Sequence, residues 1–260
     1  MSRIDAAFAG PRRPRLITYV TAGDPDFDTS ARILIALAGA GVDVLEVGVP
    51  FSDPLADDPV IQRASERARA AGMTLRGTLD LVRKVRASVD TPIVLFTYAN
   101  PVVRMDPVVF ARTAKSAGVD GVLILDYPVE EAEPLRAPMI DAGLDPIFLI
   151  SPTTTDERIR RSGELGRGFL YVISRLGVTG VRDNLAADVG ALVGRVRAQS
   201  AMPVAVGFGI SSPEHVTEAC ASADAAVVGS ALVKVIAEHG TSPDVGRRAA
   251  EYVRWLRGAA

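Results

Sequence analysis

The segment AGVDVLEVGVP, residues 40–50, contains the pattern that predicts the fold of this chain. A glycine ends a helical stretch, an aspartate follows two residues later, and the next apolar run has the composition of a buried strand. The tetrapeptides AGVD, AGLD and ASAD precede later apolar runs, at residues 117–120, 142–145 and 221–224. Because a glycine lets the chain turn from a helix back into a sheet, the pattern indicates a repeated helix–turn–strand unit.

Eight apolar runs are expected to form strands. Each run is apolar throughout rather than alternating, which is typical of parallel strands covered by helices on both faces. The expected strands are Leu16–Thr21, Val42–Val49, Ile93–Thr97, Gly121–Leu125, Pro146–Ile150, Phe169–Ser174, Val204–Phe208 and Ala225–Val228. The repetition predicts an α/β fold, a (β/α)8 TIM barrel, with residues 1–260 as one domain and extra helices at Arg3–Phe8 and Pro243–Arg257. A doubly wound open sheet is the main alternative.

The composition limits the classes of protein to which the chain can belong. Of 260 residues, 48% are hydrophobic and the net charge is −2, so neither disorder nor nucleic-acid binding is expected. No apolar run reaches the roughly 18 residues of a membrane span, and the N-terminal stretch lacks the apolar core of a signal peptide. Cys220 is the only cysteine, which excludes an internal disulfide and a cysteine metal cage. We expect a cytoplasmic protein that uses no metal and binds no membrane.

Glu46 interrupts the apolar run of the second expected strand. Strand residues of a barrel alternate between the lumen and the helix layer, and active sites lie at the carboxyl ends of the strands. Glu46 could pair with a basic residue of a neighbouring strand, but the expected strands contain no Lys or Arg. An unpaired buried carboxylate should have a raised pKa, which suits proton transfer near neutral pH.

The loop after this strand carries three more carboxylates, Asp53, Asp57 and Asp58. We expect one of them to act with Glu46 and at least one to be a turn residue or a helix cap. Asp58 precedes Pro59, which is the pattern of an N-cap followed by proline at the first helical position.

Glycine-rich segments follow three of the later strands: SRLGVTG at residues 174–180, GFGIS at 207–211 and GSALV at 229–233. The loops after strands seven and eight of a barrel often bind phosphate at a helix N-terminus, although glycine is also common in plain turns. His215 and His239 have no metal-ligand neighbours. The residues alone therefore indicate a phosphorylated substrate with an apolar part, handled by one or two carboxylates without metal. They do not define the reaction.

The sequence resembles the tryptophan synthase alpha chain family over nearly its whole length. The motifs that carry the resemblance are TAGDP (21–25), LEVGVPFSDPLAD (45–57), PVIQRAS (59–65), GVTG (177–180), GFGIS and GSALV. The resemblance implies a lyase that cleaves indole-3-glycerol phosphate into indole and glyceraldehyde 3-phosphate by a retro-aldol reaction. It implies Glu46 and Asp57 as the catalytic residues.

The resemblance also implies the substrate-binding residues, which are Tyr19, Phe96, Tyr98, Tyr171, Thr179, Gly180, Phe208, Gly209, Gly229 and Ser230. Residues 174–184 correspond to the family's mobile loop, in which Thr179 is expected to meet Asp57 when the loop closes.

A beta chain is the partner that the resemblance implies, in an α₂β₂ heterotetramer. Pyridoxal phosphate then belongs to the beta chain, and this chain is expected to hold no cofactor. The expected interface residues are Asp53, Asn100 and Pro101.

Several positions depart from the family pattern. Asp58 replaces the usual glycine after the catalytic aspartate, and its charge is expected to restrict the loop or raise the pKa of Asp57. Thr18, Leu176 and Tyr127 are further departures. A free-standing indole-3-glycerol phosphate lyase therefore stays open as an alternative, as do a non-catalytic subunit and another sugar-phosphate enzyme on the same fold.

Overall fold

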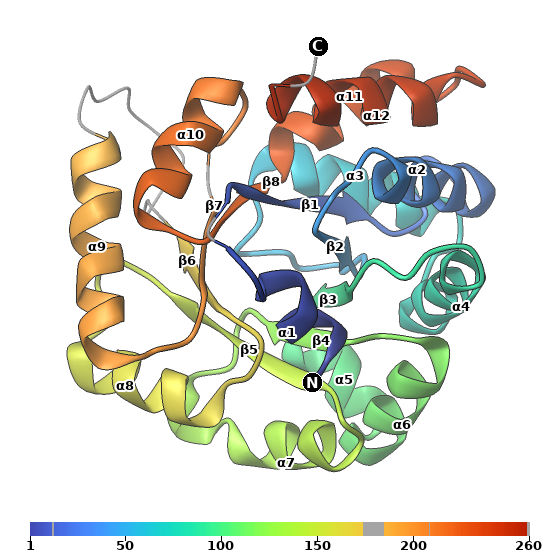
Figure 1. Cartoon of the computed structure of the whole chain (residues 1–260). Coiled ribbons are helices and arrows are strands. Elements are labelled where there is room, and N and C mark those ends of the chain that lie inside the picture. The colour runs from blue at the N-terminus through green and yellow to red at the C-terminus, as the bar shows by residue number, and fades with distance from the viewer. Residues whose placement is uncertain (12, 174–184, 208, 259–260) are drawn as a thin grey trace.

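The computed structural model describes residues 1–11, 13–173, 185–207 and 209–258. Eight parallel strands pair in chain order, and the last pairs with the first to close a barrel (Figure 1). The strands are β1 Arg15–Thr21, β2 Val44–Gly48, β3 Ile93–Thr97, β4 Gly121–Ile124, β5 Asp145–Ile150, β6 Leu170–Ile173, β7 Val204–Gly207 and β8 Ala225–Val228. The predicted (β/α)8 barrel is confirmed, and the closure excludes the open doubly wound sheet.

Helices surround the barrel in the order of the chain. The helices are α1 Arg3–Phe8, α2 Phe27–Gly39, α3 Pro59–Ala70, α4 Leu75–Arg86, α5 Ala99–Met105, α6 Pro107–Ala117, the 3₁₀ helix η1 Val129–Glu131, α7 Glu133–Asp141, α8 Asp156–Leu165, α9 Leu185–Gln199, α10 Pro213–Ser222, α11 Ser230–His239 and α12 Val245–Leu256. The expected terminal helices are therefore present as α1 and α12, and α12 packs mainly against α2.

The strands are apolar throughout because both of their faces are covered. In β2, Leu45 and Val47 pack outward into the core beneath the helices, whereas Val44 packs inward with other lumen residues. Glu46 is two residues beyond Val44 and follows the same inward direction. In the register of the sheet it lies between Tyr19 of β1 and Val94 of β3.

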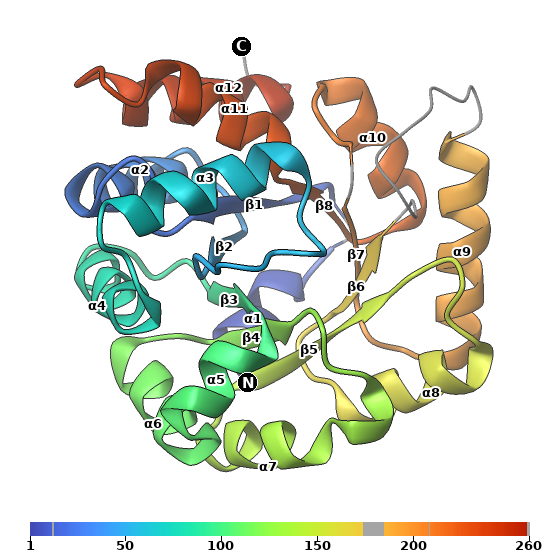
Figure 2. The ribbon, with the colours of Figure 1, turned by 180° about the vertical axis from the view of Figure 1, so that it is seen from behind.

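Helix α1 closes the amino-terminal end of the barrel, where Figure 1 shows it in front of the strands. Ile4 of α1 is fully buried among the lumen residues, and Phe8 contacts Phe169 with ring centroids 5.5 Å apart. In Figure 2 the barrel is seen from behind, with the segment from β2 to α3 running across it. The carboxyl ends of the strands are thus the accessible end of the lumen.

The expectation that no strand contains Lys or Arg is wrong at one position, because β1 begins at Arg15. The Arg15 guanidinium donates hydrogen bonds of 2.8–3.1 Å to the carbonyls of Ala7, Phe8 and Ala9, just after and within α1. It lies at the amino-terminal end of the barrel, so it does not pair with Glu46.

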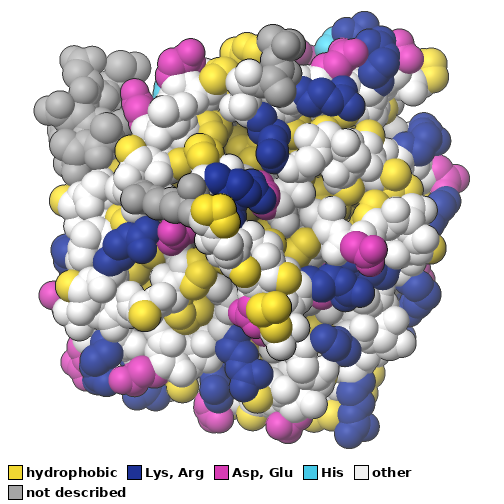
Figure 3. Space-filling model, viewed as in Figure 1, with side chains coloured by type: hydrophobic (Ala, Val, Ile, Leu, Met, Phe, Trp, Pro, Cys, Tyr) yellow, Lys and Arg dark blue, Asp and Glu magenta, His cyan; other side chains and the backbone are white. Residues whose placement is uncertain are grey.

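The surface of the described residues carries charge of both signs. On the face in Figure 3, Lys and Arg side chains are interspersed with Asp and Glu side chains, in keeping with the net charge of −2. Within the described part of the chain, every helix falls short of the length and apolarity that crossing a membrane requires.

Candidate active site

Glu46 is the middle residue of β2, faces the lumen and is completely buried. Neither of its carboxyl oxygens has a hydrogen-bond partner among the described residues. Burial without a partner disfavours the charged form and raises the pKa of Glu46 from 4.5 to about 8. The side chain is therefore a neutral acid at pH 7, and it lines a cavity.

Asp57 lies in the loop between β2 and α3 and lines the same cavity. Its pKa is raised from 3.8 to about 7, mainly by burial; a hydrogen bond from the Tyr98 hydroxyl opposes the rise, and the negative charge of Asp58 adds to it. Tyr98 lies just after β3, where its hydroxyl accepts a hydrogen bond of 3.1 Å from the Ala56 amide and its ring stacks on Phe51. Tyr98 thus anchors the loop that carries Asp57.

Two glycines make room for tyrosine hydroxyls inside the lumen. A Cβ atom on Gly48 would overlap the hydroxyl of Tyr19, and one on Gly207 would lie 2.5 Å from the hydroxyl of Tyr171. Both tyrosines line the cavity, so the absent side chains let each ring lie across the neighbouring strand. Tyr19 also meets Phe96 edge to face, with centroids 5.1 Å apart.

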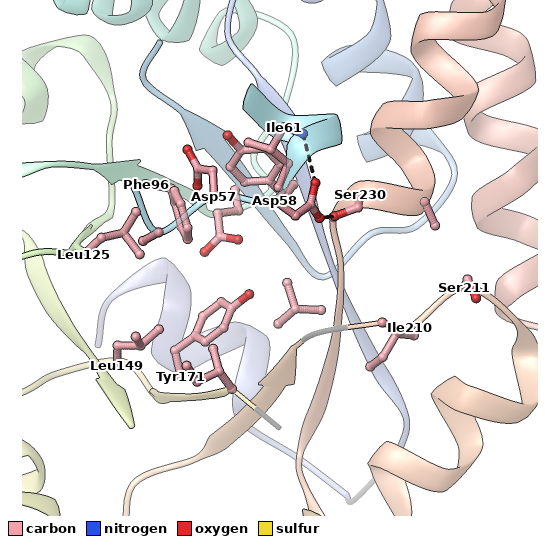
Figure 4. A pocket seen from close by; sticks show the side chains of 18 of the residues that line it. Asp57, Asp58, Ile61, Phe96, Leu125, Leu149, Tyr171, Ile210, Ser211 and Ser230 are labelled. Carbon is pink, nitrogen blue, oxygen red and sulfur yellow. Dashed lines mark hydrogen bonds between the residues drawn. The ribbon is translucent and has the colours of Figure 1, made fainter. Parts of the chain in front are cut away.

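The cavity has a volume of about 690 Å³ and two chemically different ends (Figure 4). Phe96, Leu125 and Leu149 lie at one end, and Ile210, Ser211 and Ser230 lie at the other. Gly209 and Gly229 line the cavity as well, from the loops after β7 and β8. The first end suits a planar apolar group. The second offers hydroxyls and backbone N–H groups to an anion.

Asp58 occupies the N-cap of α3, as its sequence pattern predicts. Its Oδ1 accepts hydrogen bonds of 2.7 Å from the Val60 amide and 3.1 Å from the Ile61 amide. Its Oδ2 accepts a hydrogen bond from the hydroxyl of Ser230, the first residue of α11 (Figure 4). Asp58 therefore joins the loop after β2 to the loop after β8.

The structure brings most of the predicted site residues to one place. Those that line the cavity are Glu46, Asp57, Tyr19, Phe96, Tyr171, Gly209, Gly229 and Ser230. Tyr98 lies beside the cavity and acts on Asp57. The predicted residues Thr179, Gly180 and Phe208, with the rest of 174–184, lie outside the described residues.

The expected interface residues lie near this end of the barrel. Asp53 is exposed in the loop after β2. Asn100 is exposed and Pro101 half-buried in α5, which follows β3.

Sequence reasoning missed the aliphatic lining of the cavity. The missed side chains are Leu55, Ile61, Leu125, Leu149, Ile173, Ile210 and Val227. Leu125, Leu149 and Ile173 lie at or just beyond strand ends and pack against the lumen cluster. Strand residues point alternately into the lumen and toward the helices, and this alternation could have indicated them. In strands that are apolar on both faces, however, the sequence does not show which residues point inward.

No group of three or more His, Cys, Asp or Glu side chains that could hold a metal ion occurs among the described residues. Carboxylic acids with raised pKa values, buried at the active end of a barrel, are typical of enzymes that move protons. Fold and site together define the class as a (β/α)8-barrel enzyme that uses acid–base chemistry on a substrate with an apolar part.

Comparison with known proteins gives the family within this class. Residues 6–256 match the family model described as tryptophan synthase alpha chain. The chain is 47% identical to the tryptophan synthase alpha chain of Geobacter sulfurreducens, an alignment that covers 100% of this chain and 99% of the relative. It is 46% identical to that of Burkholderia thailandensis, over 100% and 97% of the two chains.

Solved structures agree with the sequence relatives. The tryptophan synthase alpha subunit of Legionella pneumophila superposes with a TM-score of 0.91 at 35% identity, over 100% of this chain and 98% of the other. A chain of the tryptophan synthase α₂β₂ complex of Pyrococcus furiosus gives 0.88 at 38% identity, over 95% and 99%. This chain belongs to the tryptophan synthase alpha chain family.

Proposed function

We propose that the cavity at the carboxyl ends of the strands cleaves indole-3-glycerol phosphate, and that Glu46 is the group that moves the proton. The observation that carries this proposal is the state of Glu46: a buried acid without a hydrogen-bond partner among the described residues, facing the cavity. A pKa of about 8 leaves its proton in place at pH 7 yet close enough to neutrality to be given up.

The reaction needs one proton delivered and one removed. Neutral Glu46 donates its proton to C3 of the indole ring, which leaves positive charge on the ring and a carboxylate on the enzyme. The carboxylate then takes the proton of the hydroxyl on the carbon next to C3. As that oxygen becomes an aldehyde, the electrons of the carbon–carbon bond return to the ring and indole leaves. Glu46 ends protonated, so the cycle closes without a metal or redox partner.

We assign to Asp57 the stabilisation of the positive charge that develops on the indole ring. Its carboxylate can accept a hydrogen bond from the indole N–H, and this bond strengthens as the ring becomes positive. The role requires Asp57 to be ionised. Burial, which strengthens electrostatic interactions with the ring, also raises the pKa of Asp57 to about 7.

The two ends of the cavity suit the two ends of the substrate. The indole ring fits between Phe96, Leu125 and Leu149, and the phosphate fits the loops that carry Gly209 and Ser230. We propose that Thr179, Gly180 and Phe208 complete this site, as the family resemblance implies. The tryptophan synthase alpha-family relatives support this assignment.

We further propose a beta chain as the partner, in an α₂β₂ complex in which pyridoxal phosphate belongs to the beta chain. Related structures come from tryptophan synthase of Pyrococcus furiosus and of M. tuberculosis, the former an α₂β₂ complex. The predicted interface also has apolar surface to bury, because Leu55 is 93% exposed and Val103, in α5, is 54% exposed. A cytoplasmic location is part of the same proposal.

Indole release from indole-3-glycerol phosphate, measured with the purified chain alone and with a tryptophan synthase beta chain, tests the proposal. We expect release by the chain alone and a clear rise in rate with the beta chain. Release that the beta chain leaves unchanged would favour the free-standing lyase. No release under either condition would overturn the proposed activity.

The pH dependence of the reaction follows from the two carboxyl groups. The pair needs a protonated Glu46, which is lost above about pH 8, and an ionised Asp57, which is lost below about pH 7. We expect kcat/KM for indole-3-glycerol phosphate to follow a bell-shaped curve with limbs near these values. Asp57→Asn should remove the acid limb, so a curve that keeps this limb in the variant would contradict the assignment.

A further inference from the structure

Two helix N-termini meet at the polar end of the cavity, and Asp58 lies between them. One carboxyl oxygen of Asp58 caps α3 through the amides of Val60 and Ile61. The other accepts the hydrogen bond from the Ser230 hydroxyl at the start of α11. Figure 4 shows the hydrogen bonds from Ile61 and Ser230 converging on this one side chain. A single carboxylate thus accepts hydrogen bonds from its own helix and from Ser230, which lies 172 residues further along the chain.

This carboxylate occupies a place in which an anion would otherwise be bound. The first N–H groups of a helix have no acceptor within the helix, and Gly229 offers no side chain to cap those of α11. Asp58, Gly229 and Ser230 line the cavity together with Gly209 and Ser211. None of the described residues that line the cavity is Lys or Arg, so no cation among them offsets the charge of Asp58.

We propose that Asp58 sets the affinity of this end of the cavity for phosphate, by holding the Ser230 hydroxyl in the empty site and opposing the incoming negative charge. The proposal rests on the proposed function, which places the substrate phosphate at this end. A serine hydroxyl has one hydrogen to donate, so Ser230 must release Asp58 before it can donate to phosphate. Asp58 keeps its two amide donors in α3, and its charge then faces the phosphate across the site.

The repulsion between Asp58 and the phosphate destabilises the bound substrate and the transition state equally, because the phosphate does not change during carbon–carbon cleavage. Asp58 therefore weakens the binding of substrate and of glyceraldehyde 3-phosphate by similar factors. At a pH above about 7, where Asp57 is ionised with or without Asp58, removing the charge of Asp58 should lower KM for indole-3-glycerol phosphate without raising kcat. A role limited to the stability of α3 would not produce this change in KM alone.

The test compares the affinity for inorganic phosphate with the affinity for indole, both by calorimetry. Asp58→Asn and Asp58→Ser each place a neutral residue that is favoured at helix N-caps, so α3 retains a cap in either variant. Asp106→Asn is the matched control. Asp106 also precedes a proline and caps its helix, α6, with one oxygen that accepts from Val108 and Val109. It is not among the residues that line the cavity.

We expect both Asp58 variants to bind inorganic phosphate about tenfold more tightly than the wild type, since a like charge a few ångströms away is removed. Indole affinity should be unchanged in both, and Asp106→Asn should match the wild type for both ligands. Equal or weaker phosphate binding in the Asp58 variants would overturn the inference, as would an equal gain in Asp106→Asn. Indole release by the wild type tests the proposed function separately, so the two failures can be told apart.

Discussion

Glu46→Gln is expected to lower the rate of indole formation by about 10³-fold or more, since positioned general acids and bases contribute roughly 10²–10⁴-fold. Glutamine keeps the size of the side chain and its place in the lumen, but it can neither donate the proton to C3 nor accept one from the hydroxyl. Substrate binding should be retained, because the phosphate and the indole ring contact other residues. Steady-state rates together with a binding measurement check both expectations.

The same substitution should raise the stability of the protein at alkaline pH. A carboxyl group whose pKa is raised in the folded state contributes most to stability below its unfolded pKa, and this contribution is lost as the pH rises through the folded pKa. For Glu46 the two values are 4.5 and about 8. Glutamine is neutral at every pH in this range. The free energy of unfolding of Glu46→Gln, relative to that of the wild type, should therefore increase by roughly 3–5 kcal/mol between pH 4.5 and about pH 8.

A matched control separates these effects from those of a generic Glu→Gln change. Glu218 is exposed in α10, and Glu218→Gln should alter neither the rate nor the dependence of stability on pH. Glu46→Gln with a near-normal rate would remove Glu46 from the mechanism. A stability difference that does not change with pH would show that Glu46 is already ionised in the folded protein.

Asp57→Asn is expected to lower kcat by about 10²–10³-fold, which is the usual loss when one group that stabilises transition-state charge is removed. Asparagine retains an oxygen that can face the indole N–H and accept the hydrogen bond from Tyr98. It lacks the negative charge that opposes the positive charge of the protonated ring. KM should change little, because the ring carries no charge in the bound substrate.

The control for this prediction is Asp141→Asn, at the exposed C-terminal end of α7. It should leave kcat and KM unchanged. If Asp57→Asn raised KM and left kcat intact, Asp57 would be a binding residue, and the charge on the ring would have another counterpart.

The strands of this protein could be predicted from sequence because burial on both faces makes each of them a continuous apolar run. In such a run a charged residue stands out, so the sequence alone indicates Glu46 as a candidate site residue. The N-cap at Asp58 is equally predictable, since an Asp-Pro pair before a helical pattern indicates the start of a helix without reference to distant residues. These features depend only on neighbours in the chain.

The parts of the site that could not be predicted depend on distant segments. The Asp58–Ser230 hydrogen bond joins the loop after β2 to the start of α11, which follows β8. These segments come together only when β8 pairs with β1 and closes the barrel. The contact of Tyr98 with Asp57 depends on how the loop after β2 folds over the end of β3. The family resemblance implies that Tyr98 binds indole; the structure adds that Tyr98 supports the loop that carries Asp57. Spacing along the chain contains none of this information.

The proposed reaction begins only if Glu46 is a neutral acid in the folded enzyme at pH 7. The most direct measurement is an infrared titration of the carbonyl stretch of protonated carboxyl groups, taken as the difference between the wild type and Glu46→Gln. A protonated carboxyl signal that persists at pH 7 and disappears through about pH 8 is the expected result. Loss of that signal near pH 4.5 would contradict the account, because Glu46 would then have no proton to give to the indole ring.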